Sequence, residues 1–423
     1  MTPPRAQVEP RSLGSWFAAA RPALLVGVFV LVLALLGAAA GPARRMTRVL
    51  SAGGTAAAAF VLGPDSLYTA HFGDSPNSQS GVRGFSLTDG SLRWAASVPQ
   101  NVQNLVLDAR AHVLMGRSGT DPKFIFLDSD SGTALWHNAE PNTSVVAMGF
   151  GRVLMRTDIS ESRTSLRLAD ARTGRLIWMR DVEPTTELGP DELYGDSPSR
   201  IVVVGSTGKV IVLNYADGSV LGEGDLHVRL QSDDYRSPPV DSVEVSTVGD
   251  HLYVSRRNGD HTSLTAYSTV PFARQWEVAD GPAGRVLDCA AVLCVTGTGW
   301  VSGVDPRTGR PRWTAPGWAA AFRYGANLLF ASGRQETPEA AFLDSASGRV
   351  VHRLGRTYLM GDLLLRVDDA IAGQTWVAEV DRSDGSTQTV GTLDTAAPFG
   401  CSVRAAYLAC PTTAGPTRVW RAP

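Results

Sequence analysis

The sequence contains little of several residue types that would narrow its function. Of its 423 residues, four are cysteine, and charged residues make up only 19%. Basic charge is almost entirely arginine, because the only lysines are Lys123 and Lys209. The formal net charge is −2 and the isoelectric point is near 6.4, so composition gives no electrostatic case for nucleic-acid binding.

Catalytic motifs and helical periodicity are also missing. No serine nucleophile elbow, phosphate-binding loop or zinc motif occurs, and the seven histidines are scattered. After residue 50 no stretch keeps a helical period, which sets aside helix-bundle and Rossmann folds. Instead, short apolar runs recur at steady intervals, beginning with 58–62, 65–69 and 82–87. Several of these runs alternate apolar and polar residues, as half-buried strands do.

One long apolar run lies near the N-terminus. Residues 22–41 carry no charge and are long enough to cross a bilayer as a helix. Arginines lie on both sides of the run, so charge gives no orientation, and a cleaved signal peptide is the alternative. We predict a disordered cytoplasmic N-terminus (1–21), a transmembrane helix (22–41), a linker (42–55) and one large domain (56–423).

The four cysteines form two local pairs, Cys289 with Cys294 and Cys401 with Cys410. Each pair lies in an apolar, strand-like run interrupted by a possible turn, so hairpins would bring the side chains close enough to bond. Two such disulfides indicate an oxidising compartment. We therefore expect the large domain outside the cytoplasmic membrane. Four buried free thiols are the alternative, and zinc fits the spacing poorly.

A short phrase recurs along the domain: an apolar residue, an Asp or Asn, small or polar residues, a Gly, and often a Trp four residues later. The recurring glycines are Gly90, Gly132, Gly174, Gly218, Gly309, Gly348 and Gly385. The matching tryptophans are Trp94, Trp136, Trp178, Trp276 and Trp313. The first three glycines are each 42 residues apart, and a repeat of that length holds about four short strands.

The phrase has a physical reading. An Asp at a strand end accepts hydrogen bonds from backbone N–H groups two residues on, forming an Asx turn. The Gly then takes a positive φ and closes a hairpin. A Trp beyond it can pack either against the adjacent sheet or within its own. Both readings make these residues structural.

The phrase with its downstream Trp resembles the docking repeat of the pyrroloquinoline-quinone-like β-propellers, over roughly residues 56–423. This family includes quinoprotein alcohol dehydrogenases and the outer-membrane assembly lipoprotein. The resemblance implies an all-β propeller of four-stranded blades, eight most often, with seven or nine open. The quinoproteins hold their cofactor against a disulfide between adjacent cysteines. This sequence has no adjacent cysteines, so we expect no cofactor, no metal and no catalytic residue.

These observations favour a non-enzymatic, membrane-anchored propeller that binds other proteins of the cell envelope. A quinoprotein oxidoreductase or another propeller enzyme is one alternative, and a sensor of a small ligand is another. Loops on a propeller rim are the expected contact sites. The candidate segments are Gly73–Ser80, Glu183–Asp196 and Arg229–Pro239.

Overall fold

The computed structural model describes residues 46–52, 59–71, 80–98, 101–118, 123–190, 198–230, 241–333, 339–367, 371, 374–394, 398–412 and 416–422. The chain divides into two compact units, Met1–Arg45 and Met46–Pro423. The predicted segments 1–21 and 22–41 lie outside the described residues. Within the described part, no helix is both long and apolar enough to span a membrane.

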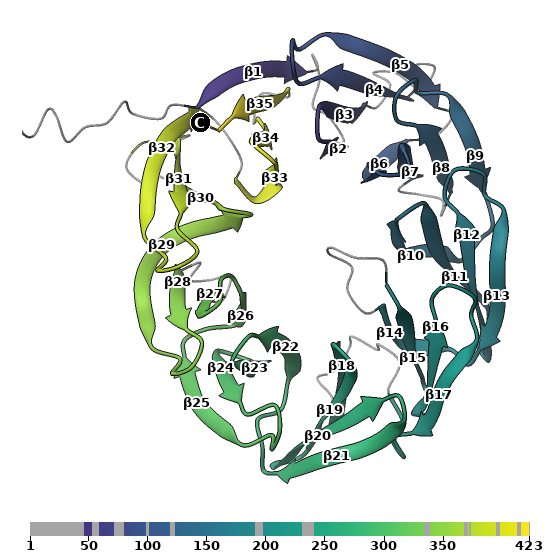
Figure 1. Cartoon of the computed structure of the whole chain (residues 1–423), viewed down its shortest axis with the longest axis vertical. Coiled ribbons are helices and arrows are strands. Elements are labelled where there is room, and N and C mark those ends of the chain that lie inside the picture. Colours follow the sequence, from purple (N-terminus) through teal and green to yellow (C-terminus); the bar gives the residue numbers. More distant parts are fainter. Residues whose placement is uncertain are drawn as a thin grey trace, which may run out of the picture. The chain divides into compact units, whose positions relative to one another are not determined.

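The unit Met46–Pro423 is built from β-strands. Its described residues form 35 strands and one short 3-10 helix, η1 (Pro398–Gly400). The strands pair into eight antiparallel sheets, seven with four strands and one with seven. The sheets follow one another in sequence order around a ring, which is the arrangement of a β-propeller (Figure 1).

Each blade is a meander of consecutive strands, lettered A to D from the inner to the outer strand. The first three blades consist of β2 (Ala59–Leu62), β3 (Ser66–His71), β4 (Ser80–Ser86), β5 (Leu92–Val98); β6 (Val102–Asp108), β7 (Val113–Ser118), β8 (Phe124–Asp128), β9 (Ala134–Asn138); and β10 (Thr143–Gly149), β11 (Arg152–Ser160), β12 (Arg163–Asp170), β13 (Leu176–Val182). The next three consist of β14 (Thr185–Pro190), β15 (Arg200–Gly205), β16 (Lys209–Asn214), β17 (Val220–Asp225); β18 (Asp241–Val248), β19 (His251–Asn258), β20 (His261–Thr269), β21 (Phe272–Ala279); and β22 (Arg285–Cys289), β23 (Val292–Gly297), β24 (Trp300–Val304), β25 (Pro311–Pro316).

The seven-stranded sheet contains two blades that share a strand. It consists of β26 (Ala320–Arg323), β27 (Leu328–Ser332), β28 (Glu339–Asp344), β29 (Val350–Met360), β30 (Leu363–Val367), β31 (Gln374–Val380) and β32 (Thr387–Asp394). The first part of β29 pairs with β28 up to Arg356, and its last part pairs with β30 from Thr357 onward. β29 is thus the outer strand of blade 7 and the inner strand of blade 8. We expected eight blades, with seven or nine open. The described strands form eight sheets, and the shared strand divides the seven-stranded sheet into two blades, which makes nine blades.

Blade 9 joins the two ends of the domain. It consists of β33 (Ser402–Arg404), β34 (Tyr407–Pro411), β35 (Thr417–Arg421) and, as its outer strand, β1 (Thr47–Ala52). β1 pairs with β35 from Thr47–Arg421 to Ala52–Thr417. This strand lies inside the segment 42–55 that we expected to be a linker, so the propeller begins near Thr47 and not at residue 56. The N-terminal strand closes the ring by completing the C-terminal blade.

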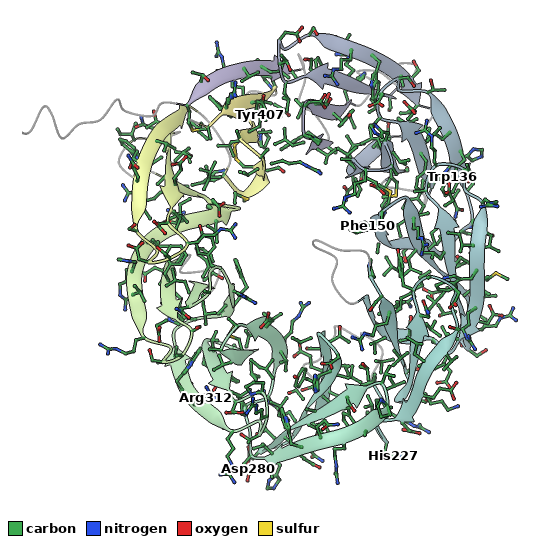
Figure 2. All side chains as sticks on the ribbon, in the orientation of Figure 1. Trp136, Phe150, His227, Asp280, Arg312 and Tyr407 are labelled. Carbon is green, nitrogen blue, oxygen red and sulfur yellow. A yellow bond between two sulfur atoms is a disulfide. The ribbon has the colours of Figure 1, made fainter. Side chains whose placement is uncertain are left out.

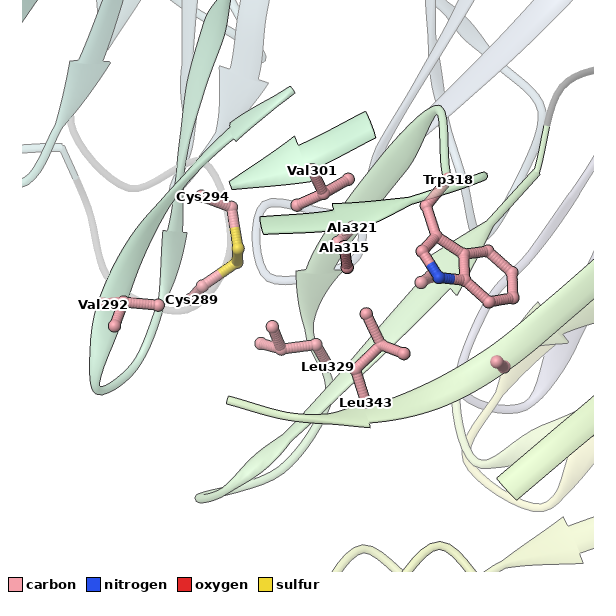
Figure 3. Packing of buried hydrophobic residues seen from close by; sticks show 11 residues of the cluster. Cys289, Val292, Cys294, Val301, Ala315, Trp318, Ala321, Leu329 and Leu343 are labelled. Carbon is pink, nitrogen blue, oxygen red and sulfur yellow. A yellow bond between two sulfur atoms is a disulfide. The ribbon is translucent and has the colours of Figure 1, made fainter. Parts of the chain in front are cut away.

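The hydrophobic core lies between blades. Nine clusters of buried residues occur in the described part, and each joins one blade to the next. One cluster joins blades 6 and 7, where Val301 and the Cys289–Cys294 disulfide pack near Leu329 and Leu343 (Figure 3). Another joins blade 9 to blade 1 through Leu50 and Val419. The ring is therefore stabilised mainly by apolar burial between neighbouring sheets.

The meander gives the propeller two different faces. In four consecutive antiparallel strands, the A–B and C–D turns lie at one end and the B–C turns and blade-to-blade connections lie at the other. We call these the turn face and the connection face. The C–D turns are short and similar, as between β8 and β9 or β12 and β13. The connections vary, and the segment from Asp225 to Asp241 joins β17 to β18.

Candidate interaction surface

The C–D turns of the turn face adopt the Asx geometry expected from the repeated phrase. Asp128 Oδ1 accepts hydrogen bonds from the backbone N–H groups of Asp130 (3.1 Å) and Ser131 (2.9 Å). Asp170 accepts equivalent bonds from Arg172 and Thr173. All seven predicted glycines have φ between 68° and 76°, a region that favours glycine.

Each predicted tryptophan links its own blade to the turn of the next blade. The indole Nε1–H donates to a backbone carbonyl there, at 2.9 Å in four cases and 3.1 Å in the fifth. The pairs are Trp94–Ser129, Trp136–Ala171, Trp178–Tyr215, Trp276–Pro306 and Trp313–Ser345. Figure 2 shows Trp136 on the outer side of the ring and Phe150 at its inner edge. The indole also packs within its own blade, because the Phe126 ring stacks on the Trp136 indole with their centroids 3.8 Å apart. Both readings of the Trp therefore describe the structure.

The turn glycine makes room for this indole. A Cβ placed on Gly132 would lie 2.4 Å from the Trp94 ring, and one on Gly174 would lie 2.7 Å from Trp136. Gly218, Gly309 and Gly348 face Trp178, Trp276 and Trp313 in the same way. Glycine is thus required twice, by the backbone φ and by the aromatic ring.

Four junctions depart from this pattern, and the sequence phrase did not identify them. In blade 7, His352 takes the Trp position, and its Nε2 lies 3.1 Å from the Asp384 carbonyl beside Gly385. At the ring closure Leu50 contacts Gly90 instead.

At the remaining two junctions the residue four positions after the phrase glycine is Gly222 in blade 4 and Thr389 in blade 8. At blade 4, Phe272 of blade 5 packs over Gly224. At blade 8, Met46 packs over Gly391. His352 follows Gly348 by four residues, so its spacing carried a signal. Leu50 and Gly391 follow no phrase glycine at that spacing.

Both cysteine pairs are disulfides. Cys289 and Cys294 join β22 to β23, and their Cα atoms are 5.6 Å apart. Cys401 and Cys410 join the start of β33 to β34, with Cα atoms 4.2 Å apart. All four side chains are buried. The second disulfide lies in blade 9, the blade that closes the ring.

The turn face uses its charges internally. Arg172 donates to Asp128 of the preceding blade at 2.5 Å. Burial by itself would raise the pKa of Asp128, but hydrogen bonds from Arg172 and Ser131 outweigh it and lower that pKa. The pKa of Asp305 is lowered by its ion pair with Arg312 and by the Arg307 N–H. Both carboxylates already accept hydrogen bonds from neighbouring residues, which leaves them poorly placed to bind a substrate or transfer a proton.

The connection face holds a pocket of about 510 Å³ between blades 3 and 4. Its walls are apolar, with Val182, Val203 and Val210 among them, and its rim carries Asp181, Glu183, Glu223 and Lys209. Lys209 Nζ lies 3.0 Å from Glu183, and Thr207 donates to the same carboxylate. These contacts lower the pKa of Glu183 and raise that of Lys209.

A second pocket on the connection face, of about 290 Å³, lies between blades 5 and 6. Its polar lining includes Ser242, Glu244 and Arg257. Burial raises the pKa of Glu244, opposed by the charge of Arg285. The turn face also has a pocket, of about 620 Å³, between blades 8 and 9, where Arg382 bonds Asp362 at 2.6 Å.

Of the predicted contact segments, the structure describes only Ser80, 183–190 and 229–230. Glu183 lines the first pocket, as part of the predicted segment Glu183–Asp196. Most of Gly73–Ser80 and Arg229–Pro239, and residues 191–196, lie outside the described residues. Other lining residues, such as Ser162 and Lys209, were not predicted because they come from different strands. Among the described residues, no group of three His, Cys, Asp or Glu side chains could hold a metal ion.

Comparisons with known proteins show which protein family the sequence matches. The sequence matches the family described as outer membrane protein assembly factor BamB over residues 79–187 and 162–389. No curated protein sequence matches it.

Three solved structures are similar to the chain. The structure of BamB from Moraxella catarrhalis has 13% identity and a TM-score of 0.46, covering 89% of this chain and 97% of that one. The C-terminal WD40 domain of Sif2 has 10% identity and a TM-score of 0.48, covering 90% and 100%. Sqt1 of Saccharomyces cerevisiae has 10% identity and a TM-score of 0.47, covering 90% and 100%.

The two matched segments together span more than half of the sequence and cover most of the blades. The repeated phrase, the docked tryptophans and the ring of four-stranded blades all lie within or beside them. The chain therefore belongs to the pyrroloquinoline-quinone-like β-propeller repeat family described as outer membrane protein assembly factor BamB.

Proposed function

We propose that this protein is a non-enzymatic, membrane-anchored propeller that binds other proteins of the cell envelope through its connection face. Residues 22–41 serve as a single transmembrane anchor and residues 1–21 remain in the cytoplasm. The propeller lies outside the cytoplasmic membrane.

The two disulfides support the extracytoplasmic location. Structural disulfides persist in oxidising compartments and are rare in the cytosol. All four cysteines of the sequence are paired, and none is free. A cytosolic propeller would keep these hairpin thiols reduced.

The main observation in support of a binding role is that the two faces differ in what their residues do. The conspicuous residues of the turn face, the Trp, Gly and Asp of each phrase, are committed to joining blades. The connection face combines variable connections with two interblade pockets. Variable loops on a rigid scaffold are where propellers recognise partners.

The family description concerns outer membrane protein assembly, and we propose for this chain only the broader role of binding envelope proteins. The predicted absence of a cofactor fits this role. The hairpin disulfides also differ from the adjacent-cysteine ring of the quinoproteins.

The test is crosslinking of intact cells that produce the full chain, followed by purification from membranes and mass spectrometry. We expect the same envelope proteins to be recovered in repeated preparations, and to be lost with Lys209→Glu in the first pocket. Recovery of the chain alone under all conditions would contradict the proposal. A quinone chromophore in the purified protein would favour the oxidoreductase, and a tightly bound small molecule would favour the sensor.

A further inference from the structure

The outer strand of blade 3 exposes more apolar surface than a free sheet edge usually does. Leu176, Ile177 and Met179 are 51%, 39% and 59% exposed. β13 has a strand partner on one side only, β12. β13 carries one bulge, at Ile177, and β5, β9 and β17 have a bulge at the equivalent place, so the bulge does not set β13 apart. Natural proteins protect such edges with charges as well as bulges, because an open apolar edge pairs with another strand.

The other outer strands in the described part are better protected. β5 exposes only Leu92 among its large apolar residues, and β17 exposes only Leu221. β29 exposes Val350 and Val351, but three arginines accompany them: Arg349, Arg353 and Arg356. Two copies of that strand would bring like charges together.

β13 has opposite charges at its two ends. Arg175 precedes the apolar residues and Asp181 follows them, and both are exposed. Within the part of the chain that the structure describes, Asp181 pairs with Arg163 at 3.7 Å. In an antiparallel pair of β13 strands centred on Trp178, Arg175 of each copy lies opposite Asp181 of the other. In the same register Ile177 lies opposite Met179, and Leu176 lies opposite Arg180, which also donates to the Gly218 carbonyl of the next blade. The charged ends are therefore complementary, and the apolar contact is between Ile177 and Met179.

We infer that β13 forms an antiparallel edge-to-edge pair with β13 of a second copy, making a two-fold symmetric dimer. A two-fold interface uses the same patch on both copies, which is what a self-complementary strand provides. The pairing extends the four-stranded sheet of blade 3 across two propellers and covers Leu176, Ile177 and Met179.

The register gives a thiol-crosslinking test on the full chain in detergent or nanodiscs. The four native cysteines are all in disulfides, so only introduced thiols respond. Differently tagged Ile177→Cys and Met179→Cys chains should crosslink to each other under mild oxidation, because facing residues lie within about 5.5 Å. Each variant alone should crosslink far less. Equal crosslinking of the single variants would overturn this register.

The mass of the full chain tests the dimer itself. We expect a dimer by sedimentation or light scattering, and Met179→Lys should weaken dimerisation roughly tenfold or more because it leaves a charge unpaired in the pair. The matched control is Leu92→Lys on β5, a residue 53% exposed, which should leave the dimer unchanged. A monomer at all concentrations, or equal loss from both variants, would overturn the inference.

Discussion

The two faces of this propeller are built from the same strands but carry different kinds of residue. On the turn face, the same three residues recur in blade after blade: an Asx carboxylate, a glycine with positive φ and an indole from the preceding blade. On the connection face, length and composition change from blade to blade, and charged residues line two pockets; the turn face has one such pocket, with Asp362 and Arg382. The repeated residues of the turn face hold neighbouring blades together. The variable residues of the connection face form the surface that we propose to bind partners. If this is right, substitutions on the turn face should change folding, and those on the connection face should change binding.

The largest effect is expected from Trp178→Ala. Its side chain is 8% exposed and links blades 3 and 4. Removing a buried indole should lower the free energy of unfolding by about 4 kcal/mol. Urea unfolding would measure it, with His352→Ala as the matched variant at a docking position occupied by an exposed imidazole. A loss no larger than that of the histidine variant would contradict the docking account.

Gly132→Ala should have the next largest effect and lower the free energy of unfolding by about 3 kcal/mol. The alanine would be strained in the left-handed backbone conformation and would clash with Trp94. Gly249→Ala is the control, because Gly249 also has a positive φ of 57° but nothing within 4 Å of an added Cβ. The control should lose about 1 kcal/mol. Equal losses would show that the indole does not require glycine.

Replacing Cys401 and Cys410 by serine should lower the free energy of unfolding by about 2.5 kcal/mol, because the unfolded chain regains the entropy of an open loop. The sequence separation of this pair is 9, against 5 for Cys289 and Cys294. The Cys289–Cys294 pair, which closes the shorter loop, should therefore contribute slightly less. Thermal unfolding with and without reductant would compare the two double variants, and the opposite order would contradict this loop-entropy account.

Acid should weaken the turn face first. Burial alone would raise the pKa of Asp170, but bonds from Thr173 and Arg172 lower it below the ordinary 3.8. A carboxyl whose pKa is lowered by folding stabilises the protein above its unfolded pKa and loses this contribution as pH falls through the folded pKa. We expect stability to fall below about pH 4, with a shallower fall for Asp170→Asn. Identical pH profiles for the two proteins would contradict the assignment.

The smallest effect on folding is expected from Lys209→Ala on the connection face. Its side chain is 62% exposed, and an ion pair as open to solvent as that with Glu183 contributes little to stability. Partner recovery after crosslinking should nevertheless decrease. A variant that unfolds, or one that binds normally, would remove the distinction between the faces at this position.

The sequence predicted the turn face far better than the connection face. The phrase located all seven glycines and five docked tryptophans because an Asx turn and a positive φ are local requirements. Leu50 and Met46 could not be found in this way, since ring closure brings them to the last blades from the other end of the domain. The double role of β29 depends on where the chain changes its strand partner. The pocket with Ser162, Glu183 and Lys209 is assembled from a turn, a blade-to-blade connection and a strand, and no local pattern marks it.

The most direct test of the two-face account is photocrosslinking in intact cells from one position on each face. A photoreactive residue at Ser162 lies in the pocket between blades 3 and 4, and one at Thr88 lies in the exposed C–D turn of blade 1. The account predicts discrete crosslinks to envelope proteins from position 162 and none from position 88. Crosslinks from position 88 alone, or none from position 162, would contradict it.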